Sequence, residues 1–396
     1  MNKENLGNKI PFWLILMALI TALGPITIDM YLPAFPAIAR DLGVSQHNIE
    51  LTVSSYLLGL SLSQLFIGPL TDRYGRKKPL LFGLGLYLLA TLGCLFTTSF
   101  EMLMLSRTLQ AFGAASCIVI PRAVIRDHFN TQEAAHALSL LMLIMGLAPV
   151  LAPIAGGYLA PIVGWRGLFG FMLLAAILLI VLCIAKLEES LKPEHASQLN
   201  AKTIFKNYTG LLCHKNFMAF ALCGGLAMAG LFSFISSSPT IFIDQFGVAP
   251  EHFGYLFGLN AGGMILGSQL SVRMLRKHPS HTVLKKALLL TITGSGVGLL
   301  LALTGLINLP LFVICMLVLS CGIGIINPNA TALALKEQGG RLGVASALMG
   351  CILFMFGTLT SSLVSSWQTG TAVPLLTSLF VCSLISFICG RFIGRA

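Results

Sequence analysis

Between its second and third apolar segments the chain reads Gly68-Pro69-Leu70-Thr71-Asp72-Arg73-Tyr74-Gly75-Arg76-Lys77-Lys78. The two glycines permit close helix contact and a tight turn, because glycine lacks the side chain that hinders both. Asp72 is an acid inside a dense basic cluster. A loop that only had to carry positive charge would need the basic residues, but neither the glycines nor the acid. The pattern therefore predicts a structured turn with a function of its own.

The rest of the chain is strongly apolar. Of its 396 residues, 56% are hydrophobic and only 10% are charged, and the mean hydropathy is +0.87. A soluble chain carries roughly 25% charged residues. Runs of about 20 apolar residues recur, each long enough to cross a ~30 Å hydrocarbon core as a helix. We expect an all-α polytopic membrane protein with twelve spans, near 11–35, 48–70, 79–98, 101–122, 134–158, 164–185, 216–241, 252–272, 283–306, 309–331, 341–366 and 372–392.

Basic residues alternate between the loops on the two sides of these spans. The loops after the even-numbered spans, together with the two ends of the chain, hold nearly all lysines and arginines, whereas the opposite loops hold only Arg40 and Arg166. Cytoplasmic loops carry such an excess, so both termini are expected in the cytoplasm. The first span follows the N-terminus without a small-residue cleavage site, so no cleaved signal peptide is expected.

This distribution also explains the net charge of +11 without a nucleic acid partner. The positive residues are scattered over alternate short loops rather than gathered on one surface. The ten cysteines show no CxxC spacing and the eight histidines no pair at ligand spacing. No Ser/His/Asp grouping is visible either. We therefore expect no metal, no cofactor and no enzymatic activity, and a channel is disfavoured because polar positions are too few to line a pore.

A long polar stretch divides the chain into two sets of six spans. The predicted domains are 1–186 (first six-helix bundle), 187–215 (cytoplasmic linker) and 216–396 (second six-helix bundle). Two such halves suggest an internal repeat with the ligand site near the bilayer midplane between them. A weak echo of the loop after span two follows span eight, at 267–277.

Asp29 is the strongest candidate for the chemistry of the protein. It lies in Pro25-Ile26-Thr27-Ile28-Asp29-Met30-Tyr31-Leu32-Pro33, and we take it to be the only carboxylate well inside an apolar segment. An ionisable group at membrane depth is costly, and one that is tolerated usually faces a bundle interior where it serves ions or substrates. The flanking prolines predict an irregular backbone near the charge.

Arg107 is the predicted electrostatic partner of Asp29. Each lies about six residues from the outer end of its span, which at 1.5 Å per residue places both at ~9 Å depth. A static buried ion pair would be the structural alternative, but buried pairs stabilise poorly because desolvation offsets most of the attraction. We therefore expect Asp29 and Arg107 to couple transport to protons. Burial favours the neutral acid and a nearby arginine favours the carboxylate, so a cationic or dipolar substrate would change proton occupancy.

The motifs together resemble those of a known family. Gly68-x-x-x-Asp72-Arg73-x-Gly75-Arg76-Lys77 resembles the signature loop of the major facilitator superfamily, and Leu103-x-x-x-Arg107-x-x-Gln110-Ala111-x-Gly113-Ala114-Ala115 its fourth-helix motif, with Ala111 where a glycine is usual. The stretch 146–157 is similar to the fifth-helix antiporter motif. With the sequence around Asp29, the chain resembles the bicyclomycin-resistance (Bcr/CflA) type of multidrug:proton antiporters.

The resemblance implies export of drugs or small amphipathic compounds in exchange for protons, by alternating access across the bacterial inner membrane. It also implies a conformational gate that packs helix two against helix eleven and an antiporter motif in helix five. Some related exporters carry a second acid in helix one, where this chain has Thr21. Export of a natural metabolite (a nucleoside, amino acid or small thiol) and proton-coupled uptake remain alternatives. The gate residues are Gly68, Asp72, Arg73, Gly75, Arg76 and Arg341, and those of the antiporter motif are Gly146, Pro149, Pro153, Gly156 and Gly157.

Polar, aromatic and flexible side chains within the spans are candidates for the substrate pocket. The aromatic rings could equally face lipid or pack in the core, whereas buried amides need partners. The expected partners are the bilayer, small-molecule substrates and protons, and a monomer is expected. The candidates are Tyr31, Tyr56, Gln110, Arg122, Met142, Phe232, Phe234, Asn260 and Asn327.

Overall fold

The computed structural model describes residues 11–129, 131–191, 201–338, 342–367 and 369–392. These residues form helices and turns, and no strand occurs among them. One short 3₁₀-helix, η1, and one π-helix, η3, interrupt the α-helices. The elements are α1 (Phe12–Asp29), η1 (Leu32–Ala34), α2 (Phe35–Leu42), α3 (Gln46–Tyr74), α4 (Lys77–Leu95), α5 (Phe100–His128), α6 (Thr131–Lys186), α7 (Ala201–Leu212), α8 (Lys215–Pro239), η3 (Thr240–Gln245), α9 (Pro250–Leu275), α10 (Ser280–Leu303), α11 (Leu309–Leu335), α12 (Leu342–Ser366) and α13 (Val373–Phe392).

The helices confirm the predicted all-α membrane fold and its spans. Ten helical segments of the described chain are long and apolar enough to cross a membrane. One of them lies in α6, which turns at Gly164 with φ at 70° and so supplies two spans, near the predicted 134–158 and 164–185. That backbone angle suits glycine, because a side chain is strained there. With α9, which matches the expected span 252–272, the helices account for all twelve.

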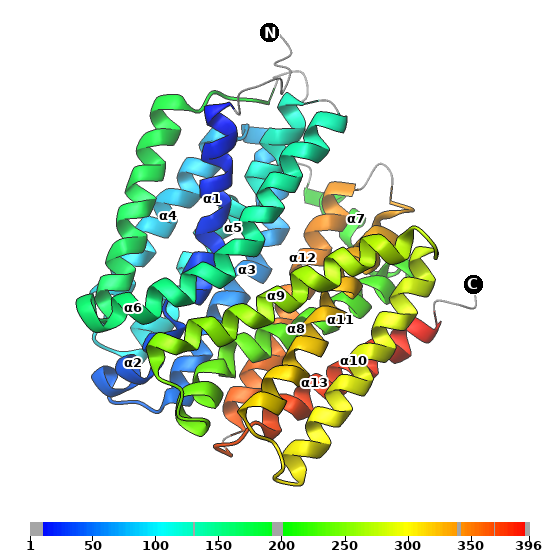
Figure 1. Ribbon diagram of the computed structural model, residues 1–396. Coiled ribbons are helices and arrows are strands. Elements are labelled where there is room, and N and C mark those ends of the chain that lie inside the picture. The colour runs from blue at the N-terminus through cyan, green and yellow to red at the C-terminus, as the bar shows by residue number, and fades with distance from the viewer. Residues whose placement is uncertain (1–10, 130, 192–200, 339–341, 368, 393–396) are drawn as a thin grey trace.

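The two sets of spans form two bundles that lie against each other (Figure 1). α3 of the first set packs along α12 of the second and touches α8, and α6 packs along α9. The linker region is not wholly irregular, because it contains α7. Tyr208 of α7 donates a hydrogen bond from its hydroxyl to the carbonyl oxygen of Leu65 in α3, at 3.0 Å. This bond ties the connection between the bundles to the side of the first one.

Contact between the bundles is uneven along α3. Its first four turns carry several hydrogen bonds to the second bundle, as at Ser54, whose hydroxyl lies 2.7 Å from that of Ser361. Its last turns are free of such cover, and the side chains of Phe66 and Tyr74 are 59% and 53% exposed. In this conformation the bundles are therefore joined at the end where α3 begins and are apart where it ends.

Candidate functional site

Asp29 is the last residue of α1 and is almost completely buried, with 3% of its surface exposed. The helix contains Pro25, and the backbone turns at Met30 and Tyr31 before η1 begins. The irregular backbone that the flanking prolines predict is therefore present. The Oδ1 atom of Asp29 has no hydrogen-bond partner. A buried carboxyl oxygen without a partner is costly, so this group is poised to gain a proton or a ligand.

Arg107 of α5 is fully buried and lies in a cage of aromatic rings. Its guanidinium carbon is 4.3 Å from the centroid of the Tyr31 ring and 4.4 Å from that of Tyr56, on α3. Its Nη1 donates to Oε1 of Gln110 at 2.6 Å, and its Nη2 donates to the carbonyl oxygen of Thr27 at 3.1 Å. Rings placed over a desolvated cation stabilise it by about 2 kcal/mol or more, so the cage partly replaces a counter-ion.

Glycines on α3, α4 and α5 allow the close packing that forms this cage. A Cβ atom at Gly59 of α3 would overlap the carbonyl oxygen of Thr108 on α5, and one at Gly113 would lie 2.5 Å from the backbone nitrogen of Tyr87 on α4. The same Cβ at Gly59 would lie 2.7 Å from Cβ of Ala111. The family pattern usually has a glycine at position 111, which allows the neighbouring helix to approach. Here position 111 is an alanine, and Gly59 on α3 allows the close approach instead.

Asp29 and Arg107 do not form an ion pair in this conformation, although both belong to the described part of the chain. Arg107 does reach α1, but it contacts the carbonyl oxygen of Thr27 instead of Asp29. Two residues that are two positions apart on a helix are rotated by ~200° around its axis. When Thr27 faces Arg107, Asp29 therefore points away from it. Arg107 therefore touches the chain on both sides of Asp29, at Thr27 and Tyr31, without neutralising it.

The pocket candidates separate into groups. Tyr31, Tyr56 and Gln110 surround Arg107, and Nε2 of Gln110 also donates to Thr91 at 2.8 Å. These three side chains hold the arginine in place. The hydroxyl of Tyr31 lies 2.9 Å from that of Thr52, whereas the hydroxyl of Tyr56 is buried without a partner.

The remaining candidates are dispersed. Phe234 is core, stacked on Phe257 at 5.7 Å, and Asn260 is bonded to Ser320 within the second bundle. Met142 is exposed and Asn327 half-buried. Among the pockets of the described chain, one small pocket lies where the bundles meet and another lies among α8, α10, α11 and α13. Neither is lined by any of the nine candidates.

Two candidates keep features that suit a ligand. Phe232 lies against Phe354 of α12, with ring centroids 5.5 Å apart. Arg122 of α5 reaches Met145 of α6, with 3.6 Å between Nη2 and the thioether sulfur, while its Nε is buried without a partner. A cation so placed could attract a polar group of a substrate.

The loop after α3 is organised around Arg76. Its Nε donates to Asp127 at 2.9 Å and its Nη1 to Asp72 at 2.7 Å, so α3, α4 and α5 meet at one guanidinium. The carboxylate of Glu189, beyond α6, accepts hydrogen bonds from the backbone nitrogens of Arg76 and Lys77 at 2.7 and 3.1 Å. An anion at these unpaired donors stabilises the start of α4.

The two glycines of this loop differ. Gly75 has φ at 89° and ψ at −179°, and a Cβ there would overlap the carboxylate of Glu189. The predicted tight turn is therefore present, and its glycine is required. The expected close helix contact at Gly68 is wrong for this conformation, because no atom lies within 4 Å of a Cβ built there. Arg73 lies over the ring of Tyr74, at 5.5 Å. Arg341, the proposed partner of the gate, lies outside the described residues.

Two glycines of the fifth-helix motif, Gly156 and Gly157, lie where α6 approaches other elements closely. A Cβ at Gly156 would overlap the carbonyl oxygen of Met30, next to Asp29, and one at Gly157 would lie 2.7 Å from the carbonyl oxygen of Pro250 on α9. A Cβ at Gly146 would meet Ile265 of α9 at 3.8 Å. α6 thus links the Asp29 region to the second bundle. Pro149 and Pro153 lie within the helix.

Sequence reasoning missed four residues that the structure makes important. Glu50 is buried at 1% exposure, so Asp29 is not the only enclosed carboxylate. It was missed because it follows the polar run 45–48 and because the second bundle supplies its cover. Asp127 and Glu189 looked like ordinary loop acids. Asn329, rather than Asn327, is the buried amide of α11, donating to Ser271 at 2.7 Å.

A bundle of twelve membrane spans in two halves, with a buried unpaired carboxyl between packed helices, defines a polytopic membrane transporter. The sequence profile of the Major Facilitator Superfamily matches residues 17–362, so the chain belongs to that family. Its members are transporters and not enzymes. Among the described residues, no group of three or more His, Cys, Asp or Glu side chains could hold a metal ion.

Relatives of known name support the drug-resistance type within the family. The chain is 36% identical over 374 residues to the uncharacterized MFS-type transporter YdgK of Bacillus subtilis, covering 93% of this chain and 92% of the relative. It is 31% identical over 384 residues to the bicyclomycin resistance protein homolog of Haemophilus influenzae, covering 96% of each. The fold is similar to the crystal structure of a D-xylose-proton symporter, with a TM-score of 0.74 at 12% identity over 97% of both chains.

Proposed function

We propose that this transporter exports drugs or small amphipathic compounds in exchange for protons, by alternating access across the bacterial inner membrane. The observation that carries the proposal is Asp29, a buried carboxyl with an unpartnered oxygen at the end of α1. The relative named for bicyclomycin resistance, matched over 96% of both chains, supports the substrate class.

Arg107 acts as a positioning residue in this proposal. It holds the carbonyl oxygen of Thr27 and the ring of Tyr31, two residues before and two residues after Asp29. A proton or a substrate that binds Asp29 alters the backbone between these two anchors and, through Arg107, the packing of α1 on α5. Proton and substrate then exclude each other at Asp29, because the neutral acid no longer attracts a cationic or dipolar compound.

The membrane potential and proton gradient supply the energy. Each elementary charge that crosses gains ~2.3 kcal/mol per 100 mV, which suffices to export a weakly bound compound against a gradient. No cofactor is required for this cycle, and a single chain supplies both bundles, so a monomer suffices.

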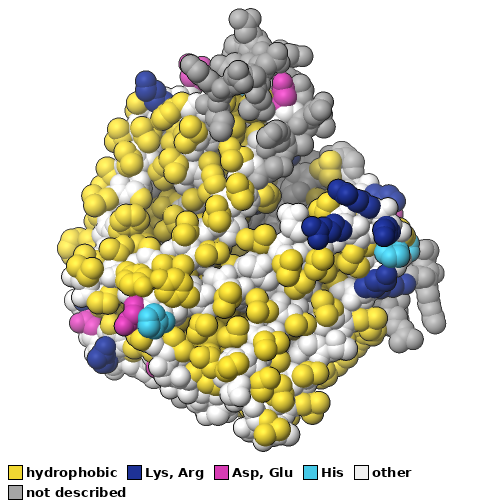
Figure 2. All heavy atoms as spheres, in the orientation of Figure 1, with side chains coloured by type: hydrophobic (Ala, Val, Ile, Leu, Met, Phe, Trp, Pro, Cys, Tyr) yellow, Lys and Arg dark blue, Asp and Glu magenta, His cyan; other side chains and the backbone are white. Residues whose placement is uncertain are grey.

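The surface is consistent with both termini in the cytoplasm. Figure 2 shows Lys and Arg side chains gathered where α9 meets α10, while hydrophobic side chains cover the middle of the same face. An excess of basic residues favours the cytoplasmic side. We therefore assign the end of the molecule where α3 ends and α9 meets α10 to the cytoplasm, and the end where α3 begins to the outside.

Substrate-induced proton release from purified protein tests the proposal. A panel of drugs and metabolites is added to weakly buffered protein, and a pH indicator records the protons released. Wild type should release protons with at least one compound, and Asp29→Asn should release none. Asp41→Asn is the matched control, since Asp41 is exposed and paired with Arg166, a surface pair of small energetic value.

Transport in proteoliposomes completes the test and separates the alternatives. Export driven by an imposed proton gradient should be lost in Asp29→Asn and retained in Asp41→Asn. Active transport against a gradient by Asp29→Asn would refute the role of this carboxyl. A response to nucleosides, amino acids or thiols alone would replace drugs by a natural metabolite, and substrate moving in the same direction as protons would identify an uptake carrier.

A further inference from the structure

One face of α3 forms a polar seam with the second bundle. The face carries Gln46, Glu50, Ser54 and Ser61, spaced by four, four and seven residues, as one side of a helix requires. Nε2 of Gln46 donates to Thr240 at 3.2 Å, and the hydroxyl of Ser61 donates to the carbonyl oxygen of Cys351 at 2.9 Å. The seam closes the end of the molecule that we assign to the outside.

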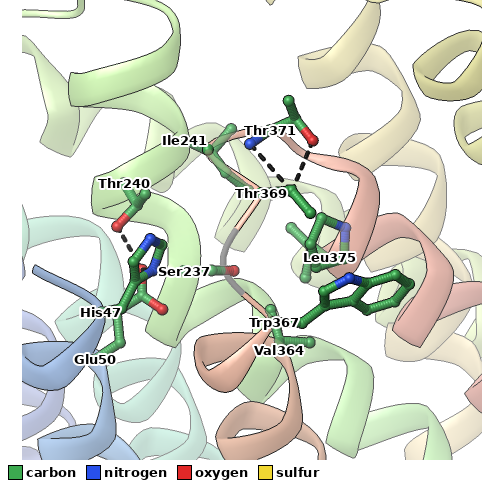
Figure 3. A pocket seen from close by; sticks show the side chains of 12 residues that line it. His47, Glu50, Ser237, Thr240, Ile241, Val364, Trp367, Thr369, Thr371 and Leu375 are labelled. Atoms are coloured by element: carbon green, nitrogen blue, oxygen red, sulfur yellow. Dashed lines mark hydrogen bonds and ion pairs between the residues drawn. The ribbon is translucent and has the colours of Figure 1, made fainter.

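Glu50 is the one charged member of this seam. Its Oε1 accepts a hydrogen bond from the hydroxyl of Thr240 (Figure 3). Its backbone carbonyl oxygen accepts one from the hydroxyl of Ser236 at 3.0 Å. Both donors belong to the second bundle. Thr240 also begins the π-helix η3, a rare backbone form that is frequent at functional sites. The side chain of Glu50 is thus enclosed only while the two bundles touch.

Two titratable groups face Glu50. Nδ1 of His47, on the same helix, lies 3.8 Å from its Oε1, and Asp244 of η3 adds a negative charge nearby. The parts of α8, α12 and α13 that line the same pocket contribute uncharged residues, among them Ser237, Val364 and Leu375. The immediate surroundings therefore hold one histidine and one further acid beside Glu50.

Alternating access requires this seam to open. Water can replace the hydrogen bonds of its serines and its glutamine, each with a net value of about 1 kcal/mol, so these contacts break and re-form readily. Glu50 differs because an open seam exposes it to water, where a carboxyl group is ionised at neutral pH. A closed seam removes that water and leaves the side chain of Glu50 buried, with His47 and Asp244 as its titratable neighbours. Loss of water in general disfavours a charged group, and a second acid nearby disfavours a negative charge further.

We propose that Glu50, with His47 beside it, is a second proton-binding site of the transporter, located at its outer gate. The site takes one proton from the external solution as the gate closes and returns it when the gate opens. External acid therefore favours the closed outer gate. This proposal rests on the proposed function, which decides that the seam faces the outside. The site adds no proton to the transport stoichiometry, because its proton comes from the external side and returns to it.

Accessibility of a buried pocket residue to a thiol reagent tests this site. Val364 of α12 lines the pocket with Glu50 and is buried. Val364→Cys, in right-side-out vesicles, is treated with a membrane-impermeant maleimide at equal pH on both sides, without substrate. The parent protein supplies the background from the native cysteines. A maleimide reacts with the thiolate, whose fraction rises with pH, so every labelling rate is divided by the rate of a free thiol at the same pH. This normalised rate should be several-fold higher at pH 8 than at pH 6, because protonation closes the gate. The labelling rates compared below are all normalised in this way.

Glu50→Gln in this background should label slowly at both pH values and lose the pH dependence, because the amide is neutral and can still accept from Thr240. Glu101→Gln, at an exposed position in the first turn of α5 on the same side, should keep the wild-type ratio. Thr240→Val should label faster at both pH values while remaining pH-dependent, because the gate loses a hydrogen bond while Glu50 and His47 are both still present.

A wild-type ratio retained in Glu50→Gln, or labelling that does not depend on pH in the parent Val364→Cys protein, would overturn the proposal. If Glu50→Gln fails to fold, Thr240→Val decides: unchanged labelling there would show that the seam contact does not hold the gate. The labelling uses neither substrate nor gradient. Its failure is therefore distinguishable from failure of the export proposal, which depends on Asp29.

Discussion

Arg107 donates a hydrogen bond of 3.1 Å from Nη2 to the carbonyl oxygen of Thr27, two residues before Asp29. The arginine therefore reaches the region of the buried acid through the backbone and not through the carboxylate. An arginine that only neutralised Asp29 could be replaced by any nearby cation. One that anchors the backbone of α1 depends on the shape of its guanidinium and on the rings that enclose it.

The first prediction follows from this geometry. Arg107→Lys should reduce proton-driven export at least about tenfold, nearly as much as Arg107→Ala, because a lysine keeps the charge but cannot bond Gln110 and Thr27 together while stacking between two rings. Export rates in proteoliposomes, normalised to the amount of folded protein, measure this. Export by Arg107→Lys at the wild-type rate would contradict it.

Tyr56 offers a matched pair of variants at the same cage. Its hydroxyl is buried without a hydrogen-bond partner, so Tyr56→Phe should keep wild-type export and stability. Tyr56→Leu removes the ring that lies 4.4 Å from the guanidinium and with it a contact of about 2 kcal/mol, so export should fall severely. Equal activity of the two variants would show that the ring is not part of the site.

Gly156 sets the position of Asp29 from the opposite side. Gly156→Ala should lower export strongly, because the added methyl group overlaps the carbonyl oxygen of Met30 and must displace the end of α1. Gly170→Ala is the control on the same helix, since a Cβ there has open space and alanine favours the helix by up to ~1 kcal/mol. Proteoliposome export and thermal unfolding of both variants make the comparison. Equal export by Gly156→Ala and Gly170→Ala would show that the close contact between Gly156 and Met30 is not needed for transport.

Gly75 provides a prediction about stability. Gly75→Ala should lower the melting temperature of the purified protein clearly, because a backbone with φ at 89° and ψ at −179° is essentially limited to glycine and costs of order 1–3 kcal/mol for other residues. The methyl group would also displace Glu189 from the start of α4. Gly43→Ala, at φ 66° with open space around it, should lower it less. A larger fall in melting temperature for Gly43→Ala than for Gly75→Ala would refute this explanation of the role of Gly75.

The sequence predicted the fold well because the length of an apolar run nearly determines a membrane span. It also predicted the tight turn at Gly75 and the burial of Asp29 and Arg107, since these depend on local spacing. It could not predict which atom Arg107 contacts, because depth along a helix says nothing about rotation around it. The burial of Glu50 could not be predicted for a different reason. In the sequence, Glu50 lies near the start of a helix and resembles a solvated residue at the edge of a loop. In the structure it is covered by the second bundle, whose residues lie nearly 200 positions later in the chain.

The last prediction concerns the inner gate at Asp72. In this conformation Asp72 is half-exposed and bonds Arg76, while α3 is uncovered at this end. When the bundles close here, we expect Asp72 to meet the start of α12, where an acid gains ~0.3–1 kcal/mol from the helix dipole and up to ~2 kcal/mol when partly buried. Such an energy biases a two-state equilibrium about tenfold without locking it.

Asp72→Asn should therefore slow turnover and shift the protein toward inward-facing conformations, with little change in substrate affinity. Glu188→Gln, at an exposed acid near the same loop, should behave like wild type. Spin-label distances between the last turn of α3 and the first turn of α12 measure the shift, and they should lengthen in Asp72→Asn alone. Arg76 keeps its bond to Asp127 in this variant, so the loop itself should stay folded. If transport falls while those distances match wild type, Asp72 does not hold the gate closed and its role lies within the loop.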